Sequence, residues 1–117
     1  MPNRKGILII EEDDFLREIL GNLLHKKGYY IVSDFCIEKS LEMIQHHRVD
    51  LVILGTSCEQ FKDKHTLRYI EERLGQKIPF FLIVHKEEKV SYLPESQQIL
   101  EKEISLKRIF QQVEKLL

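Results

Sequence analysis

The sequence predicts an α/β domain whose parallel β-sheet is covered by helices on both faces. Short runs that are apolar throughout alternate along the chain with segments whose apolar residues recur at helical spacing. Strands that are apolar on both faces are typical of a parallel sheet buried between helices. The 117 residues suffice for one domain with its own hydrophobic core. We therefore expect a single domain over residues 1–117, with right-handed crossovers between its strands.

The first strand and the first helix have the clearest signals. The run GILII, residues 6–10, is apolar and rich in β-branched residues, and it ends abruptly in EEDD. Asp13 or Asp14 is placed to cap the helix that follows, and Gly28 is placed to end it. The apolar residues that recur at helical spacing in this helix are Phe15, Leu16, Ile19, Leu20, Leu23 and Leu24.

Four further strands are predicted from short apolar runs. They are YYIVS, DLVIL, IPFFLIV and QILEK, at residues 29–33, 50–54, 78–84 and 98–102. Residues 86–98 have few apolar side chains and include Pro94, so the segment between the fourth and fifth strands is expected to be short or irregular.

Three further helices are predicted between and after these strands, each from one apolar stripe. The stripes are Ile37, Leu41 and Ile44; then Leu67, Ile70 and Leu74; and last, after a cap at Ser105, Leu106, Ile109, Phe110, Val113 and Leu116. This alternation of strands and helices predicts helices on both faces of the sheet.

Composition and charge exclude several classes of function. The 18 basic and 19 acidic residues give a formal charge of −1, and neither sign forms a long block. Binding to nucleic acid or to anionic lipid by electrostatics alone is therefore not expected. No apolar run approaches the roughly 18 residues that span a bilayer, and too few aliphatic residues follow MPNRKG to form a signal-peptide core. We expect a soluble protein of the cytoplasm.

Neither the cysteines nor the histidines form a recognisable disulfide or metal pattern. Cys36 and Cys58 lack the spacing of a disulfide framework or of a zinc site, so reduced thiols are expected. His46 and His47 are adjacent, whereas metal-binding histidine pairs on helices are four residues apart. The five histidines are interpreted as surface residues, with His85 beside the crevice of the sheet.

Residues that directly follow the strands decide the chemistry, because an open parallel sheet binds ligands in the crevice outside the carboxyl ends of its strands. No nucleophile, base and orienting group converge among them, so an enzyme is not expected. These residues are Glu11, Glu12 and Asp13, then Gly55 to Cys58, then Val84 and His85, and finally Lys102.

The sequence resembles the receiver domain of two-component response regulators. The resemblance covers essentially the whole chain, through ILIIEEDD, GYYIVSDF, DLVILG, IPFFLIV and ILEKEISLKRI. It implies a five-stranded doubly wound sheet of the flavodoxin-like order. It also implies a phosphorylation site with an acidic pair after the first strand, an acceptor aspartate after the third, Thr or Ser after the fourth, and Lys followed by Pro after the fifth.

This chain departs from that pattern at most of the site positions. The acidic pair falls on Glu11 and Glu12, and the position of the lysine is kept by Lys102. The acceptor position is Gly55, which has no carboxylate to attack a phosphoryl group. The hydroxyl position is Val84, which has no donor for a new phosphoryl group. An acyl phosphate is therefore not expected to form at position 55.

Other switch residues also differ. The aromatic that moves in the receiver switch corresponds to Ile99, and the proline after the lysine corresponds to Glu103, so an ordinary trans turn is expected there. After the third strand, Cys58 and Glu59 stand where receivers usually carry Met-Pro. Together with the altered site residues, these differences predict a domain that has lost its phosphorylation switch.

Specific magnesium binding is expected to be weak or absent. Glu11 and Glu12 are each one methylene longer than aspartate, and the third carboxylate is missing at Gly55, whereas Mg²⁺ demands close to ideal octahedral oxygen ligands. Both glutamates are interpreted as solvated acids beside the N-terminus of the first helix. Lys102 is expected to form an ion pair with Glu11 or Glu12. No cofactor is predicted.

The main hypothesis is a pseudo-receiver that acts through contacts with another protein or with another domain of the same polypeptide. By resemblance, the contact surface combines residues 86–98, the fifth strand and the last helix, with Tyr92, Leu93, Ile99 and Phe110 as candidates. The alternative is a small-molecule-binding domain of flavodoxin-like fold that uses the emptied crevice at Gly55, although no Gly-rich phosphate loop follows any strand. The sequence leaves the partner and the oligomeric state open.

Overall fold

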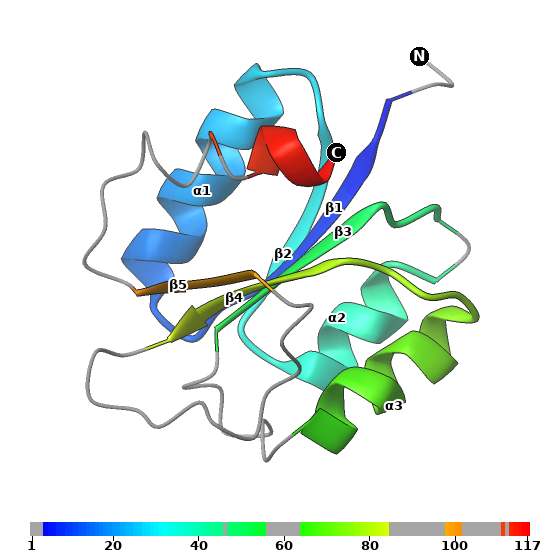
Figure 1. Ribbon diagram of the computed structural model, residues 1–117. Helices are drawn as coiled ribbons and strands as arrows, with labels where there is room; N and C mark the ends of the chain where they lie inside the picture. Colours follow the sequence, from blue (N-terminus) through cyan, green and yellow to red (C-terminus); the bar gives the residue numbers. More distant parts are fainter. Residues whose placement is uncertain (1–3, 46, 56–63, 85–97, 102–110, 112) are drawn as a thin grey trace.

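A parallel sheet forms the centre of the computed structural model, which describes residues 4–45, 47–55, 64–84, 98–101, 111 and 113–117 (Figure 1). The strand order is β2-β1-β3-β4-β5, and every neighbouring pair is parallel. The strands are β1 (Gly6–Ile10), β2 (Tyr30–Asp34), β3 (Leu51–Gly55), β4 (Phe80–Val84) and β5 (Gln98–Glu101). This order, which is the flavodoxin-like one, reverses direction between β1 and β3, so the ligand crevice of such a sheet lies at their carboxyl ends.

The predicted parallel α/β architecture is confirmed. β1 has the predicted bounds, and each of the other strands begins and ends within two residues of its prediction. The largest shift is at β4, which begins at Phe80, two residues after the start of the predicted run. Pro79 just before it has no amide hydrogen to give to the sheet, while its carbonyl accepts the amide of Val52 from β3.

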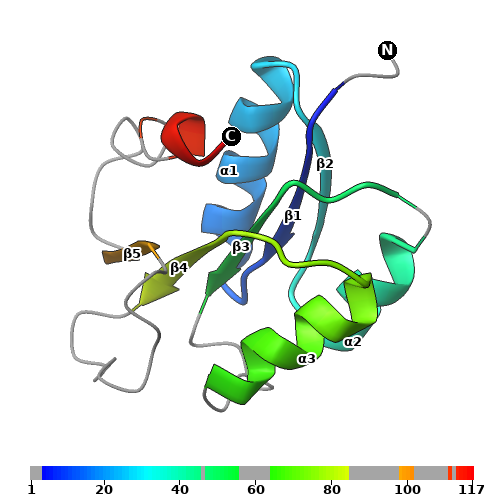
Figure 2. The same ribbon diagram turned by 45° about the vertical axis from the view of Figure 1, so that its right-hand side comes forward.

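Helices cover both faces of the sheet, as predicted (Figures 1 and 2). α1 (Asp14–Lys26) shares one face with the helical residues 113–116, and α2 (Ile37–Met43) and α3 (Lys64–Leu74) lie on the other. Each face has its own buried cluster. On the α1 side it includes Ile7, Ile9, Leu20, Leu24, Phe81 and Val113, and on the α2 and α3 side it includes Leu8, Ile10, Leu41, Ile70 and Phe80.

α1 begins and ends with the predicted signals. Asp13, one of the two predicted alternatives, is the N-cap, and its Oδ1 accepts the amide of Leu16 at 3.1 Å. Gly28 follows the C-cap with φ of 100°, a conformation that favours glycine. The prediction that Phe15 belongs to the buried stripe is wrong, because its side chain in the first turn is 75% exposed.

The amino end of the sheet joins β1 to the segment before β3. The amide of Gly6 donates to Asp50 Oδ2 at 2.8 Å, and the amide of Asp50 donates to the carbonyl of Gly6 at 2.8 Å. Arg48 adds an ion pair with Asp50 at 2.8 Å. A Cβ atom at Gly6 would lie 2.2 Å from the carbonyl oxygen of Arg48, so this backbone contact requires glycine.

Several predictions fall outside the described residues, among them the Ser105 cap, Cys58 and all of the predicted irregular segment 86–98 except Gln98, which begins β5. Cys36 is a half-buried reduced thiol. In the part of the chain that the structure describes, no helix combines the length and apolarity that crossing a bilayer requires.

Candidate functional site

Glu11 and Gly55 lie side by side at the carboxyl ends of the two strands where the strand order reverses. Ile10 of β1 pairs with Leu54 of β3, so the next residues along the two strands are Glu11 and Gly55. The main chain of Glu11 is held on its other side by β2, because its amide donates to the carbonyl of Asp34 at 3.1 Å. The position that the resemblance assigns to the acceptor aspartate therefore has Glu11, the residue after β1, as its neighbour.

The expectation that Glu11 is a solvated acid is wrong. Its side chain is fully buried, with 0% exposure, and its Oε2 accepts the amide of Asp13 at 2.7 Å. Burial of a carboxylate is tolerated when hydrogen bonds replace its water. Glu12, in contrast, is exposed as expected. The two glutamates are adjacent in sequence and occupy opposite environments.

Gly55 explains why Glu11 can be buried. An ideal Cβ atom at Gly55 would lie 2.3 Å from Glu11 Oε1 and 2.9 Å from Glu11 Cδ, which is far inside van der Waals contact. The Glu11 carboxylate thus occupies the space in which a side chain at position 55 would begin. The alternative hypothesis expected an emptied crevice at this point, and the Glu11 carboxylate takes up the part of it nearest to Gly55. Binding of a small molecule in the crevice stays a prediction.

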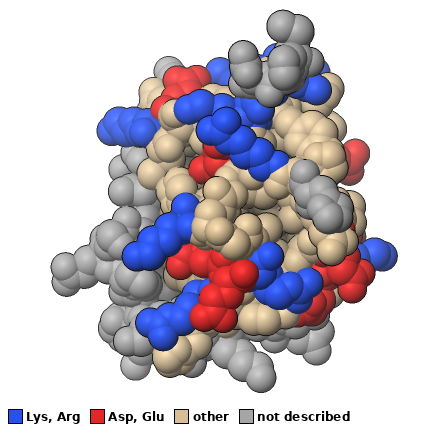
Figure 3. All heavy atoms as spheres, turned by 90° about the vertical axis from the view of Figure 1, so that its right-hand side faces the viewer, with Lys and Arg blue, Asp and Glu red and all other residues tan. Residues whose placement is uncertain are grey.

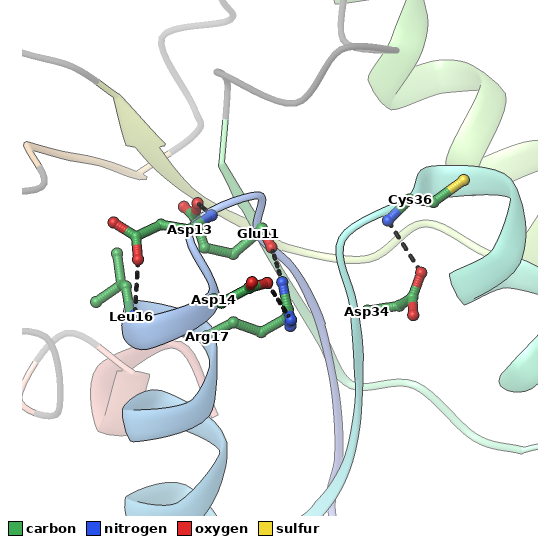
Figure 4. A network of polar contacts seen from close by, with 7 residues as sticks. All are labelled: Glu11, Asp13, Asp14, Leu16, Arg17, Asp34 and Cys36. Atoms are coloured by element: carbon green, nitrogen blue, oxygen red, sulfur yellow. Dashed lines mark hydrogen bonds and ion pairs between the residues drawn. The ribbon is translucent and has the colours of Figure 1, made fainter.

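Arg17 contacts the turn that leads from Glu11 into α1 and stabilises it (Figure 4). Its Nη1 donates to the carbonyl of Glu11 at 2.8 Å, and its Nη2 lies 2.6 Å from Asp14 Oδ1. The guanidinium also lies over the ring of Phe35, 5.9 Å from the centroid. Sequence reasoning did not identify Arg17 as a site residue. The available signal was the Asp-Arg spacing of three on a predicted helix, which by itself indicates only a surface ion pair.

The remaining predicted site positions are described in part or not at all. Val84 ends β4 and pairs with Glu101 of β5, and Ile99 pairs with Leu82, which fixes their main chain only. Lys102 lies outside the described residues, so its ion pair with Glu11 or Glu12 stays a prediction. The candidate contact residues Tyr92, Leu93 and Phe110 also lie outside them.

Metal ligands do not gather in the described part of the chain. Within those residues no group of three or more His, Cys, Asp or Glu side chains could hold a metal ion. The described histidines include His47, whose ring stacks on Tyr30 at a centroid distance of 5.1 Å. Weak or absent magnesium binding remains a prediction.

A polar groove lies away from Gly55, between α1 and the edge strand β2. It has a volume of about 690 Å³, and its walls include Arg17, Gly21, Ile31 and Ser33. This edge of the sheet therefore offers room for a small molecule.

Charges on the face that carries α2 and α3 are mixed in sign (Figure 3). An ion pair of 2.7 Å between Glu38 and Arg73 joins these two helices, and the hydroxyl of Tyr69 donates to the same glutamate. Both basic and acidic side chains are visible on this face in the figure, with most of the acidic ones in its lower half. The described side chains of this face therefore carry both signs of charge.

Comparison with known proteins identifies the fold. No family model matches the chain, and no curated protein matches it. Solved structures do, and three examples are similar over nearly their whole length. A two-component response regulator from Clostridium difficile has a TM-score of 0.82 at 20% identity, covering 97% of this chain and 95% of its own. A CheY-like response regulator receiver domain protein from Methanospirillum hungatei JF-1 has a TM-score of 0.79 at 15% identity, covering 97% of this chain and 94% of its own. The receiver domain of the hybrid histidine kinase CckA has a TM-score of 0.77 at 23% identity, covering 96% of this chain and 98% of its own. The chain thus has the receiver fold.

Proposed function

We propose that this domain is a pseudo-receiver, a receiver-like signalling domain that is not phosphorylated and acts through protein–protein contacts in a two-component-type pathway. One observation carries the proposal. At the acceptor position of a receiver fold there is a glycine, and the buried Glu11 carboxylate occupies the space where the acceptor side chain would begin. The proposal assigns neither catalytic activity nor a cofactor to the domain, and it places the domain in the cytoplasm.

The carboxylate that is present is a poor substitute for the missing acceptor. A phosphoryl group can be transferred only to an oxygen that it can approach to about 3–3.5 Å in line with its leaving group. Glu11 is fully buried, and its Oε2 is engaged by the amide of Asp13. Burial and this hydrogen bond both argue against Glu11 as an acceptor.

A receiver-like domain without this trigger must be controlled in another way. Receivers work by shifting populations between two conformations, and a ligand can shift them only through a difference in its affinity for the two. Without phosphorylation, the domain rests in one conformation or is shifted by the partner that binds it. This is why we propose a protein partner as the input or the output of the domain.

Intact-mass measurement tests the proposal. The protein is incubated with a small acyl-phosphate donor and Mg²⁺, beside a phosphorylatable receiver domain as positive control. We expect an adduct on the control and none on this chain. A stable, stoichiometric phosphoryl adduct would overturn the proposal, and repeating the assay with Glu11→Gln would then show whether Glu11 itself is the acceptor.

A further inference from the structure

Two residues from neighbouring strands share one space in this domain. The side chain of Glu11, after β1, extends over Gly55, the last residue of β3, so that its Oε1 lies 2.3 Å from where a Cβ of Gly55 would be. Either residue therefore limits what the other can be. A larger residue at position 55 requires the Glu11 carboxylate to leave, and the present place of the carboxylate requires glycine at position 55.

We propose that the residues at positions 11 and 55 are energetically coupled. The Glu11 side chain, held over Gly55 at the end of β3, keeps the turn of residues 11–13 and the start of α1 in a single arrangement. This inference deepens the proposed function, and it rests on that function wherever it bears on signalling by the domain. The coupling itself is a property of the folded chain and can be measured separately.

The hydrogen bonds explain how the effect of the Glu11 side chain reaches α1. Glu11 Oε2 accepts the amide of Asp13 at 2.7 Å, and Asp13 Oδ1 in turn accepts the amide of Leu16 as the N-cap of α1. The carbonyl of Glu11 accepts Arg17 from the second turn of the helix at 2.8 Å. A side chain at Gly55 that displaces the carboxylate would therefore disturb the Asp13 amide first and the helix cap next.

Burial distinguishes this arrangement from an accidental contact. Glu11 is one of two buried polar or charged residues among the described residues of the chain, the other being Ser40. A flexible exposed carboxylate could swing away from a new Cβ at little cost. A fully buried one that is hydrogen-bonded to the main chain must break that bond and push its neighbours aside.

A double-mutant cycle on the full chain tests the coupling. In the natural background, Gly55→Ala should lower the Tm by at least about 5 °C. In a Glu11→Ala background the same Gly55→Ala should leave the Tm within about 2 °C or raise it, because the space is then open and alanine loses less backbone entropy than glycine on folding. If Glu11→Ala does not fold, Glu11→Ser takes its place in the cycle.

Two control variants make the cycle specific. Gly6→Ala introduces a Cβ that would lie 2.2 Å from a backbone oxygen, that of Arg48, so its penalty should be the same with and without Glu11. Glu11→Gln keeps the size and one carbonyl acceptor, so Gly55→Ala should remain as harmful in that background as in the natural one. Relief by Glu11→Ala, but not by Glu11→Gln, assigns the effect to the space that the side chain fills.

Amide hydrogen exchange supplies a second, local readout. Under native conditions, Gly55→Ala should accelerate exchange of the Asp13 amide at least about tenfold, since that amide loses its carboxylate acceptor, while Gly6→Ala should not change it selectively. Additive Tm changes in the cycle, or an unchanged Asp13 amide in Gly55→Ala, would overturn the coupling. A phosphoryl adduct on the natural chain would overturn the proposed function and leave the cycle interpretable, so the two failures are distinguishable.

Discussion

Each end of the β1–β3 strand pair has a glycine on one strand and a carboxylate next to the other strand. The two ends differ in the atom that leaves no room for a side chain at the glycine. At the amino end, Gly6 of β1 is bonded to the carboxylate of Asp50, just before β3. At the carboxyl end, Gly55 of β3 lies under the carboxylate of Glu11, just after β1. The atom that excludes a side chain is a backbone oxygen at Gly6 and a side-chain oxygen at Gly55.

This difference separates a requirement of the fold from a property of the site. The backbone contact at Gly6 persists whatever side chains surround it, so no substitution elsewhere can make room there. The contact at Gly55 depends on the identity of one other residue. The domain can therefore vary the chemistry at the carboxyl ends of its strands without altering the sheet, which agrees with the general observation that function varies on a constant fold.

The largest effect is expected from Gly6→Ala. The new methyl group would meet the carbonyl of Arg48 in the tightly bonded segment at the amino end, and the strands must separate to accept it. We expect a loss of about 3 kcal/mol in the free energy of unfolding, measured by urea denaturation. A loss below about 1 kcal/mol would mean that the amino end is as adjustable as the carboxyl end.

Gly55→Asp should lower stability by about 2 kcal/mol and should not restore efficient phosphorylation. The new carboxylate would begin where the Glu11 carboxylate lies, and the hydroxyl position is still Val84. Gly55→Asn, of the same size without charge, should be at least about 1 kcal/mol less harmful, because it avoids the repulsion between two carboxylates.

Urea denaturation and intact-mass measurement after phosphodonor treatment check both parts of this prediction. Combining Gly55→Asp with Glu11→Ala should recover part of the lost stability, since it frees the space. Rapid labelling of the single Gly55→Asp variant would show that the rest of the site is intact and that Glu11 moves aside easily.

Arg17→Ala should cost about 1–2 kcal/mol in unfolding free energy. The change removes the donor to the carbonyl of Glu11 and the stacking on Phe35, and both contacts belong to a side chain that is only 19% exposed. Asp14→Asn is the matched control, because it removes only the ion pair with a side chain that is 84% exposed. That variant should lose less than about 0.5 kcal/mol. Equal losses for the two variants would assign the effect to the ion pair.

Gly21→Ala should have the smallest effect, and a favourable one. Its Cβ would lie 3.9 Å from Ile31 Cγ2, an ordinary contact, and alanine is the better helix former. We expect a gain of about 0.5–1 kcal/mol in unfolding free energy. A Cβ at Gly21 would meet neither a backbone oxygen, as at Gly6, nor a carboxylate, as at Gly55. A loss of stability in Gly21→Ala would show that open space around a glycine does not predict tolerance of a side chain in this fold.

The fold could be predicted from the sequence because its strands and helices have local sequence signals. Continuous apolar runs located the strands, and Asp13 and Gly28 marked the limits of α1. Helical periodicity places Phe15 in the apolar stripe, but it does not reveal which residues of the stripe the sheet covers, and Phe15 stays 75% exposed.

The site was predicted by position but not by environment. Sequence reasoning found Glu11, Glu12 and Gly55 and treated the glutamates alike, because they are adjacent and chemically identical. Their environments differ because Gly55, 44 positions further along the chain, opens a space beside only one of them. A cavity created by a distant glycine is a property of three-dimensional packing that no local pattern contains.

The overlap between Glu11 and the missing side chain at position 55 also constrains how this sequence can evolve. A single mutation that introduced an aspartate at position 55 would create an overlap with a buried carboxylate. A first mutation at position 11 avoids that overlap, but it gives up the hydrogen bond that Glu11 accepts from the amide of Asp13. An aspartate at position 55 therefore needs a compensating change at position 11, and under the proposed function the hydroxyl at position 84 would still be missing.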